Sequence, residues 1–100
     1  MTANELKDKL SKGEKIRLID VREKDEFEQG EKIEGAENIP MGKVFVKVQK
    51  DELPKDGKIV TICKTGGRCE IVARELGPKG FDIEHLEGGI DEWKKIHEQK

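Results

Sequence analysis

The chain has 100 residues, of which 42% are charged and 33% hydrophobic. This length is typical of one domain, so we expect a single domain over residues 1–100 with a modest packed core. Lys and Arg total 20, Asp and Glu total 22, and the formal net charge is -2 with the two signs interspersed. Because there is no basic excess or stripe, nucleic acid is not an expected ligand.

The N-terminal segment and the cysteine content bear on the location of the protein. Charged side chains occur throughout the first ten residues, and no apolar run approaches the length of a membrane-spanning helix. We therefore expect a cytoplasmic protein without membrane contact, and we expect it to be a monomer. The two cysteines are expected as reduced thiols, because the cytosol is reducing.

The first half of the chain alternates between helical and strand patterns. Thr2 and Glu5 have the spacing of a capping box at a helix start. Residues 41–48 fit helical spacing and also alternate as in a strand, but Pro40 favours the helix because proline is tolerated in a first turn. We expect a helix up to residue 12, a strand at 16–21, a helix at 24–29, a very short strand at 36–39 and a helix at 41–48.

The second half repeats the alternation more clearly. The β-branched run at 58–62 is too short for a helix and predicts a strand that ends at Cys63. A helix is expected from Arg68, with one apolar stripe made by Cys69, Val72, Ala73 and Leu76. A strand at 81–86 and a closing helix at 90–96 follow. Alternating strands and helices predict an α/β fold with a central, mainly parallel β-sheet flanked by helices on both faces.

The loop between the strand at 58–62 and the following helix has the composition of an anion-binding site. A thiol at this position faces a helix N-terminus, and Lys64 and Arg68 add positive charge, so the pKa of Cys63 should be lowered. Two glycines allow the backbone N–H groups to point inward around the sulfur. The simpler interpretation is a buried cysteine followed by an ordinary turn. We favour a nucleophilic Cys63 with an anion-binding loop of Lys64, Thr65, Gly66, Gly67 and Arg68.

This loop resembles the active-site loop of the rhodanese family of sulfurtransferases, whose pattern is Cys-x-x-Gly-x-Arg. Cys63, Gly66 and Arg68 match that pattern. Other segments are similar to family landmarks in the same order, namely residues 18–22, 26–27, 35–40 and 86–93.

The resemblance implies a single-domain rhodanese-like fold without a cofactor or metal. It also implies that Cys63 takes a sulfane sulfur from a small anionic donor such as thiosulfate and becomes a persulfide. The acceptor would be a thiol, cyanide or a sulfur-carrier protein.

The chain departs from the family pattern at two places. The histidine that often follows the glycine equivalent to Gly30 is absent, so its role cannot be transferred to this chain. Cys69 stands where the family usually has Ser, Thr or Ala. Cys69 is interpreted mainly as a core residue of the apolar stripe, but it is also a candidate thiol for converting the persulfide into a disulfide or for sensing redox state.

Asp20 and Arg22 fall at the end of a strand that is expected beside the loop. They are predicted to support it through an ion pair or a hydrogen bond to its backbone, the alternative being a solvated surface pair. Cys63 and Cys69 lack the Cys-x-x-Cys spacing of a metal centre, and adding His85 and His97 does not create one.

Two other functions remain open. One is a partner-dependent sulfur-relay or persulfide-carrier module. The other is a related cysteine phosphatase or arsenate reductase, whose loop is one residue longer and encircles a tetrahedral oxyanion. Four residues separate Cys63 from Arg68, and this smaller ring suits a single sulfur atom better.

Overall fold

A parallel sheet of four strands forms the centre of the computed structural model, which describes residues 1–98. The strand order is β2-β1-β3-β4, and every neighbouring pair is parallel. The strands are β1 (Ile16–Asp20), β2 (Glu37–Asn38), β3 (Lys58–Ile62) and β4 (Asp82–His85). The helices are α1 (Ala3–Ser11), α2 (Lys24–Gln29), α3 (Met41–Gln49), α4 (Gly67–Leu76) and α5 (Gly89–Glu98), and a 3₁₀ turn (Gly77–Lys79) follows α4.

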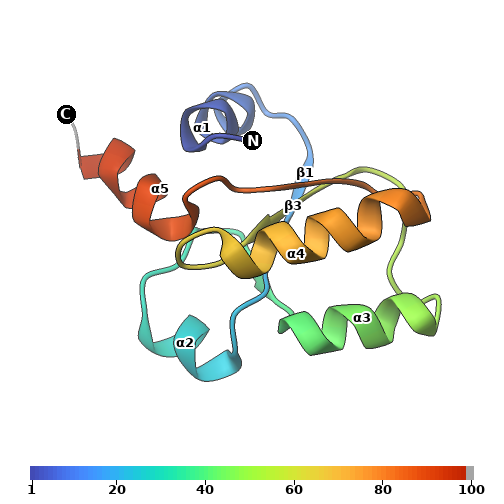
Figure 1. Cartoon of the computed structure of the whole chain (residues 1–100). Helices are drawn as coiled ribbons and strands as arrows, with labels where there is room; N and C mark the ends of the chain where they lie inside the picture. The colour runs from blue at the N-terminus through green and yellow to red at the C-terminus, as the bar shows by residue number, and fades with distance from the viewer. Residues whose placement is uncertain (99–100) are drawn as a thin grey trace.

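Helices cover both faces of the sheet, as the alternating pattern predicts. Figure 1 shows α1 and α5 together on one side of the strands, with α3 and α4 on the other. Each side has its own apolar core: Ile19, Val44, Ile59 and Val72 belong to the core under α3 and α4. Leu6, Leu18, Val60, Ile62 and Ile90 belong to the core under α1 and α5. The predicted α/β class with a parallel sheet is therefore confirmed.

The predicted elements differ from the observed ones mainly at their ends. The strand predictions for β1, β2 and β4 are each one or two residues too long, because most of the apolar residues that flank these strands are buried without being part of a ladder. The segment after Pro40 is a helix, and its alternative as a strand is wrong. Val44 is buried and Val46 is 46% exposed, which fits a helix that packs one side against the sheet.

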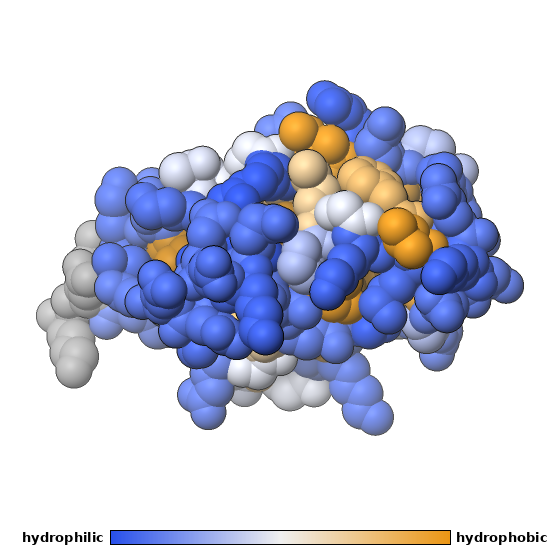
Figure 2. All heavy atoms as spheres, turned by 90° about the horizontal axis from the view of Figure 1, so that it is seen from below, coloured by the Kyte–Doolittle hydropathy of each residue, from blue (hydrophilic) through white to orange (hydrophobic). Residues whose placement is uncertain are grey.

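The outer surface is mostly charged. Figure 2, which views the molecule from the side of α2 and α3, shows hydrophilic side chains interrupted by a limited apolar area. Val46 on α3 and Ile71 on α4 are the exposed large hydrophobic residues among residues 1–98. Within the same described range, no helix is long and apolar enough to cross a bilayer.

A buried ion pair lies at the end of β1, and a hydrogen bond from it reaches the segment that follows α2. The Arg22 guanidinium donates to the Asp20 carboxylate at 2.8–3.2 Å, and its Nη2 also donates to the carbonyl of Glu31 at 3.0 Å. Asp20 is fully buried and Arg22 is 4% exposed, so the interpretation as a solvated surface pair is wrong. Asn38 completes the junction by donating to the carbonyls of Asp20 and Arg22.

Replacing Arg22 with Met should lower the free energy of unfolding by about 3 kcal/mol, because it leaves the buried Asp20 carboxylate without its partner. Arg17→Met is the matched control, since Arg17 pairs with Glu37 across an exposed part of the sheet. The control substitution should lower the free energy of unfolding by less than about 1 kcal/mol. Urea denaturation of both variants measures the difference, and equal losses would contradict the role of the buried pair.

Candidate active site

Cys63 is the first residue after β3 and lies at the carboxyl edge of the sheet, three residues before the N-cap of α4. Its side chain is only 1% exposed. Gly66 has φ +106°, a backbone angle that favours glycine, and its N–H donates to Cys63 Sγ at 3.1 Å. The backbone amides of Arg68 and Cys69 also help to lower the pKa of this thiol. An inward-facing amide of the kind that the loop glycines predict is therefore present at Gly66.

The first turn of α5 holds the other side of the loop. The N–H groups of Ile90 and Asp91 donate to the carbonyls of Cys63 and Lys64 at 2.9 and 3.1 Å, so these carbonyls are directed toward α5. Gly89 allows this approach: a Cβ there would lie 2.4 Å from the Cys63 carbonyl oxygen, and its φ is +60°. Sequence reasoning noted Gly89 only as part of the landmark at 86–93, although two glycines directly before a helix are a signal of close backbone contact.

Cys69 lies beside Cys63 as well as in the core. It is fully buried in the same apolar cluster as Val72 and Leu76, so its predicted core position is confirmed. Its Sγ also lies 3.4 Å from Cys63 Sγ, 3.3 Å from the carbonyl oxygen of Gly66 and 3.8 Å from that of Leu86. The apolar stripe predicts the burial of Cys69, but only the three-dimensional structure reveals the contact between the two thiols.

The hydrogen bond with Cys69 is the largest cause that lowers the pKa of Cys63, to about 5. Burial raises the pKa of Cys63, and the loop amides oppose that effect. The pKa of Cys69 is raised by its hydrogen bond with Cys63, by burial and by the charge of Cys63. At neutral pH the pair therefore consists of a Cys63 thiolate that accepts a hydrogen bond from a Cys69 thiol.

The predicted lowering of the Cys63 pKa is present, but the two loop cations have partners of their own and contribute less to it than expected. Arg68 forms two hydrogen bonds with the Glu26 carboxylate, at 2.7 and 2.8 Å. Lys64 Nζ lies 3.7 Å from Asp91 and its side chain is 65% exposed, so water and salt screen its charge. Arg68 retains a Coulombic attraction to Cys63, but Cys69 and the loop amides are the principal causes of the lowered pKa.

Glu26 tethers α2 to the first turn of α4. Its carboxylate accepts both hydrogen bonds from Arg68 and one from the N–H of Glu23, and the bond from Arg68 is the largest cause that lowers the pKa of Glu26, to about 2. No residue of α2 is buried, so this ion pair is a principal contact of the helix with the loop. Sequence reasoning noted Glu26 only as part of a landmark and assigned it no partner.

The remaining predicted site residues lie around this centre. Lys64, Thr65 and Gly67 are exposed on the outer side of the loop. Asp20 is at the end of β1, in register with Ile62 of β3. Among the described residues, the side chains of Asp20 and Arg22 bond to each other and to the Glu31 carbonyl, and not to the loop as expected. Residues 1–98 contain no group of three or more His, Cys, Asp or Glu side chains placed to hold a metal ion.

The family model of the rhodanese-like domain matches residues 2–96. The chain belongs to the rhodanese-like family. It is 38% identical over 89 residues to the putative sulfurtransferase YtwF of Bacillus subtilis. That match covers 89% of this chain and 84% of YtwF. It is also 38% identical over 96 residues to the probable adenylyltransferase/sulfurtransferase MoeZ of Mycobacterium tuberculosis. That match covers 95% of this chain but only 24% of MoeZ.

A solved rhodanese-like domain protein from Staphylococcus aureus has the same fold. It superposes with a TM-score of 0.81 at 30% identity, over 93% of this chain and 88% of that chain. The rhodanese-like fold predicted from the loop and its flanking landmarks is therefore confirmed, and the relatives support a sulfurtransferase family.

The alkylation rate of Cys63 with iodoacetamide should show a midpoint near pH 5, because the thiolate predominates above its pKa of about 5. Cys69→Ala should move this midpoint toward the value of about 8.5 for a free thiol, whereas Cys69→Ser keeps a donor and should move it less. Peptide mass spectrometry over a pH series measures each midpoint. A larger shift in Arg68→Met than in Cys69→Ala would contradict the assigned causes.

Proposed function

We propose that this chain is a sulfurtransferase that carries sulfane sulfur as a persulfide on Cys63. The carrying observation is the environment of Cys63 Sγ, which accepts a hydrogen bond from the Gly66 N–H at 3.1 Å and lies 3.4 Å from Cys69 Sγ, contacts that favour the thiolate. A thiolate is the reactive form in attack on a sulfur–sulfur bond. Thiosulfate is the donor we propose, because a small dianion is suited to the hydrogen-bond donors around the nucleophile.

The proposed reaction has two sulfur-transfer steps. Cys63 Sγ attacks the outer sulfur of thiosulfate, the sulfur–sulfur bond of thiosulfate breaks, and sulfite leaves with the electron pair. A thiophilic acceptor then attacks the outer sulfur of the persulfide and regenerates the Cys63 thiolate. The loop amides that now bond to Cys63 Sγ are placed to stabilise negative charge in both steps.

The geometry favours sulfur transfer over phosphoryl or arsenate chemistry. A phosphatase of this architecture uses an arginine to bind the oxyanion, but Arg68 directs both of its hydrogen-bonded nitrogens to Glu26. The four residues between Cys63 and Arg68 also form a smaller ring than an oxyanion-binding loop. These two features support a site for one sulfur atom.

Incubation with thiosulfate should increase the intact mass of the protein by one sulfur atom, and peptide mapping should place it on Cys63. Cys63→Ser should take up none, since the hydroxyl is a weak nucleophile at neutral pH. Sulfur mapped to Cys69 would overturn the assignment. Good loading from a preformed persulfide but poor loading from thiosulfate would favour a partner-fed sulfur carrier.

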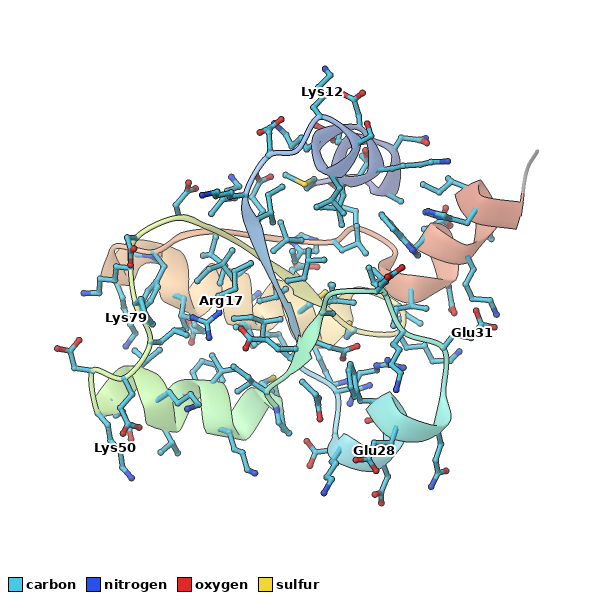
Figure 3. All side chains as sticks on the ribbon, turned by 180° about the vertical axis from the view of Figure 1, so that it is seen from behind. Lys12, Arg17, Glu28, Glu31, Lys50 and Lys79 are labelled. Carbon is cyan, nitrogen blue, oxygen red and sulfur yellow. The ribbon has the colours of Figure 1, made fainter. Side chains whose placement is uncertain are left out.

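Lys64→Ala should raise the KM for thiosulfate and reduce its dependence on salt, with kcat largely kept, because an exposed charge near the loop acts mainly by attracting the dianion. Lys12→Ala is the matched control. Lys12 has a similar exposure of 67%, pairs with Asp8, and lies on the far side of the molecule from α2 (Figure 3). Steady-state kinetics at low and high salt measure both variants. An unchanged KM in Lys64→Ala at low salt would contradict this role.

A further inference from the structure

The two cysteines form a buried pair of thiols. Sulfur transfer to an external acceptor requires only Cys63. Cys63 directly follows β3 and Cys69 lies in the first turn of α4, so the loop brings their Sγ atoms to 3.4 Å. A disulfide needs a separation of about 2.05 Å, and the difference of roughly 1.4 Å is within the range of a small side-chain rotation. Both side chains belong to one apolar cluster, where bulk water is excluded.

Loading of sulfur on Cys63 changes the surroundings of Cys69. In the free protein, the hydrogen bond with Cys63, burial and the charge of Cys63 keep Cys69 protonated. In a persulfide the negative charge moves to the outer sulfur, and Cys63 Sγ becomes a neutral, electrophilic sulfur. The Cys69 thiol then faces an electrophile instead of a thiolate, and its S–H has the Gly66 carbonyl oxygen at 3.3 Å as an alternative hydrogen-bond acceptor.

We propose that Cys69 is an internal acceptor, which converts the Cys63 persulfide into a Cys63–Cys69 disulfide and releases hydrosulfide. The inference rests on the proposed function, because it needs a sulfur-loaded Cys63. It adds a persulfide-reducing activity, in which the product is free sulfide rather than a sulfur atom passed to an external nucleophile.

The step balances within the protein and its bound sulfur. Cys69 Sγ forms a bond to Cys63 Sγ, the bond from Cys63 Sγ to the outer sulfur breaks, and the electron pair leaves with the outer sulfur. The Cys69 proton goes to that sulfur, which departs as hydrosulfide. The sulfane sulfur is reduced and the two cysteine sulfurs are oxidised. An external dithiol reductant, by two thiol–disulfide exchanges, restores both thiols for another cycle.

The loop amides assist the departing group. The Gly66 N–H donates to Cys63 Sγ, and the amides of Arg68 and Cys69 also favour negative charge on this atom, so the loop is suited to donate to the sulfur attached to it. Because these donors are part of the backbone, they are already oriented before the reaction and stabilise the negative charge that develops on the outer sulfur.

A single-turnover experiment tests this activity. Wild type and Cys69→Ser are loaded with thiosulfate, freed of small molecules and incubated anaerobically without any thiol. Free sulfide is measured over time, and intact mass after alkylation reports the remaining thiols. Wild type should release one sulfide per chain and become a Cys63–Cys69 disulfide, at a rate independent of protein concentration. Cys69→Ser should load more slowly but then retain its sulfur at least tenfold longer.

The outcomes separate this inference from the proposed function. If wild type loads sulfur but retains it as long as Cys69→Ser, the internal acceptor is wrong and the sulfurtransferase proposal stands. If wild type takes up sulfur neither from thiosulfate nor from a preformed persulfide, both are wrong. Cys69→Ala replaces Cys69→Ser should the latter fail to fold. Should both fail, peptide mapping of loaded wild type decides, since sulfide release without a Cys63–Cys69 disulfide overturns the inference.

Discussion

Two backbone hydrogen bonds, from Ile90 and Asp91 to the carbonyls of Cys63 and Lys64, determine the shape of the active-site loop. They direct these carbonyls toward α5, while the Gly66 N–H is directed toward the sulfur. A loop with its first carbonyls pointing inward would repel a thiolate. The sulfur chemistry therefore depends on α5, an element that lies more than twenty residues after the loop, and on the absence of a side chain at Gly89.

The resulting site uses two kinds of electrostatic interaction that respond differently to solvent. The donors to Cys63 are a buried thiol and backbone amides, which are shielded from salt. The cations lie further out, where Lys64 is exposed and Arg68 is paired with Glu26. Reactivity of the nucleophile and attraction of an anionic donor are therefore governed by separate groups. The Glu26 contact also joins α2 to this outer layer, which links the loop to a helix without buried residues of its own.

Much of the fold followed from local patterns in the sequence. The change from strand to helix spacing around Cys63 located the loop, and the resemblance of Cys63, Gly66 and Arg68 to a family motif indicated its chemistry. The apolar stripe correctly placed Cys69 in the core. These predictions succeeded because periodicity and turn residues act over a few neighbouring positions.

The contacts that tune the site could not be predicted in the same way. Arg68 and Glu26 are 42 residues apart, and nothing local distinguishes this pair from the many other exposed charges of the chain. The thiol contact depends on how far the loop folds back over β3, and the burial of Asp20 depends on packing from the segment after α2. The sequence correctly indicated a lowered pKa of Cys63 with a contribution from the loop amides, but it gave Lys64 and Arg68 too large a share and missed Cys69, because it shows charges without their partners.

The central claim is that Cys63 is a thiolate while Cys69 remains a thiol, and NMR titration of protein with ¹³Cβ-labelled cysteine tests it residue by residue. Resonances are assigned with Cys63→Ser and Cys69→Ser. The account predicts that the Cys63 signal titrates with a midpoint of about 5, and that the Cys69 signal keeps its thiol shift well above that pH. Ionisation of Cys69 before Cys63, or a Cys63 midpoint near the free-thiol value of about 8.5, would contradict it.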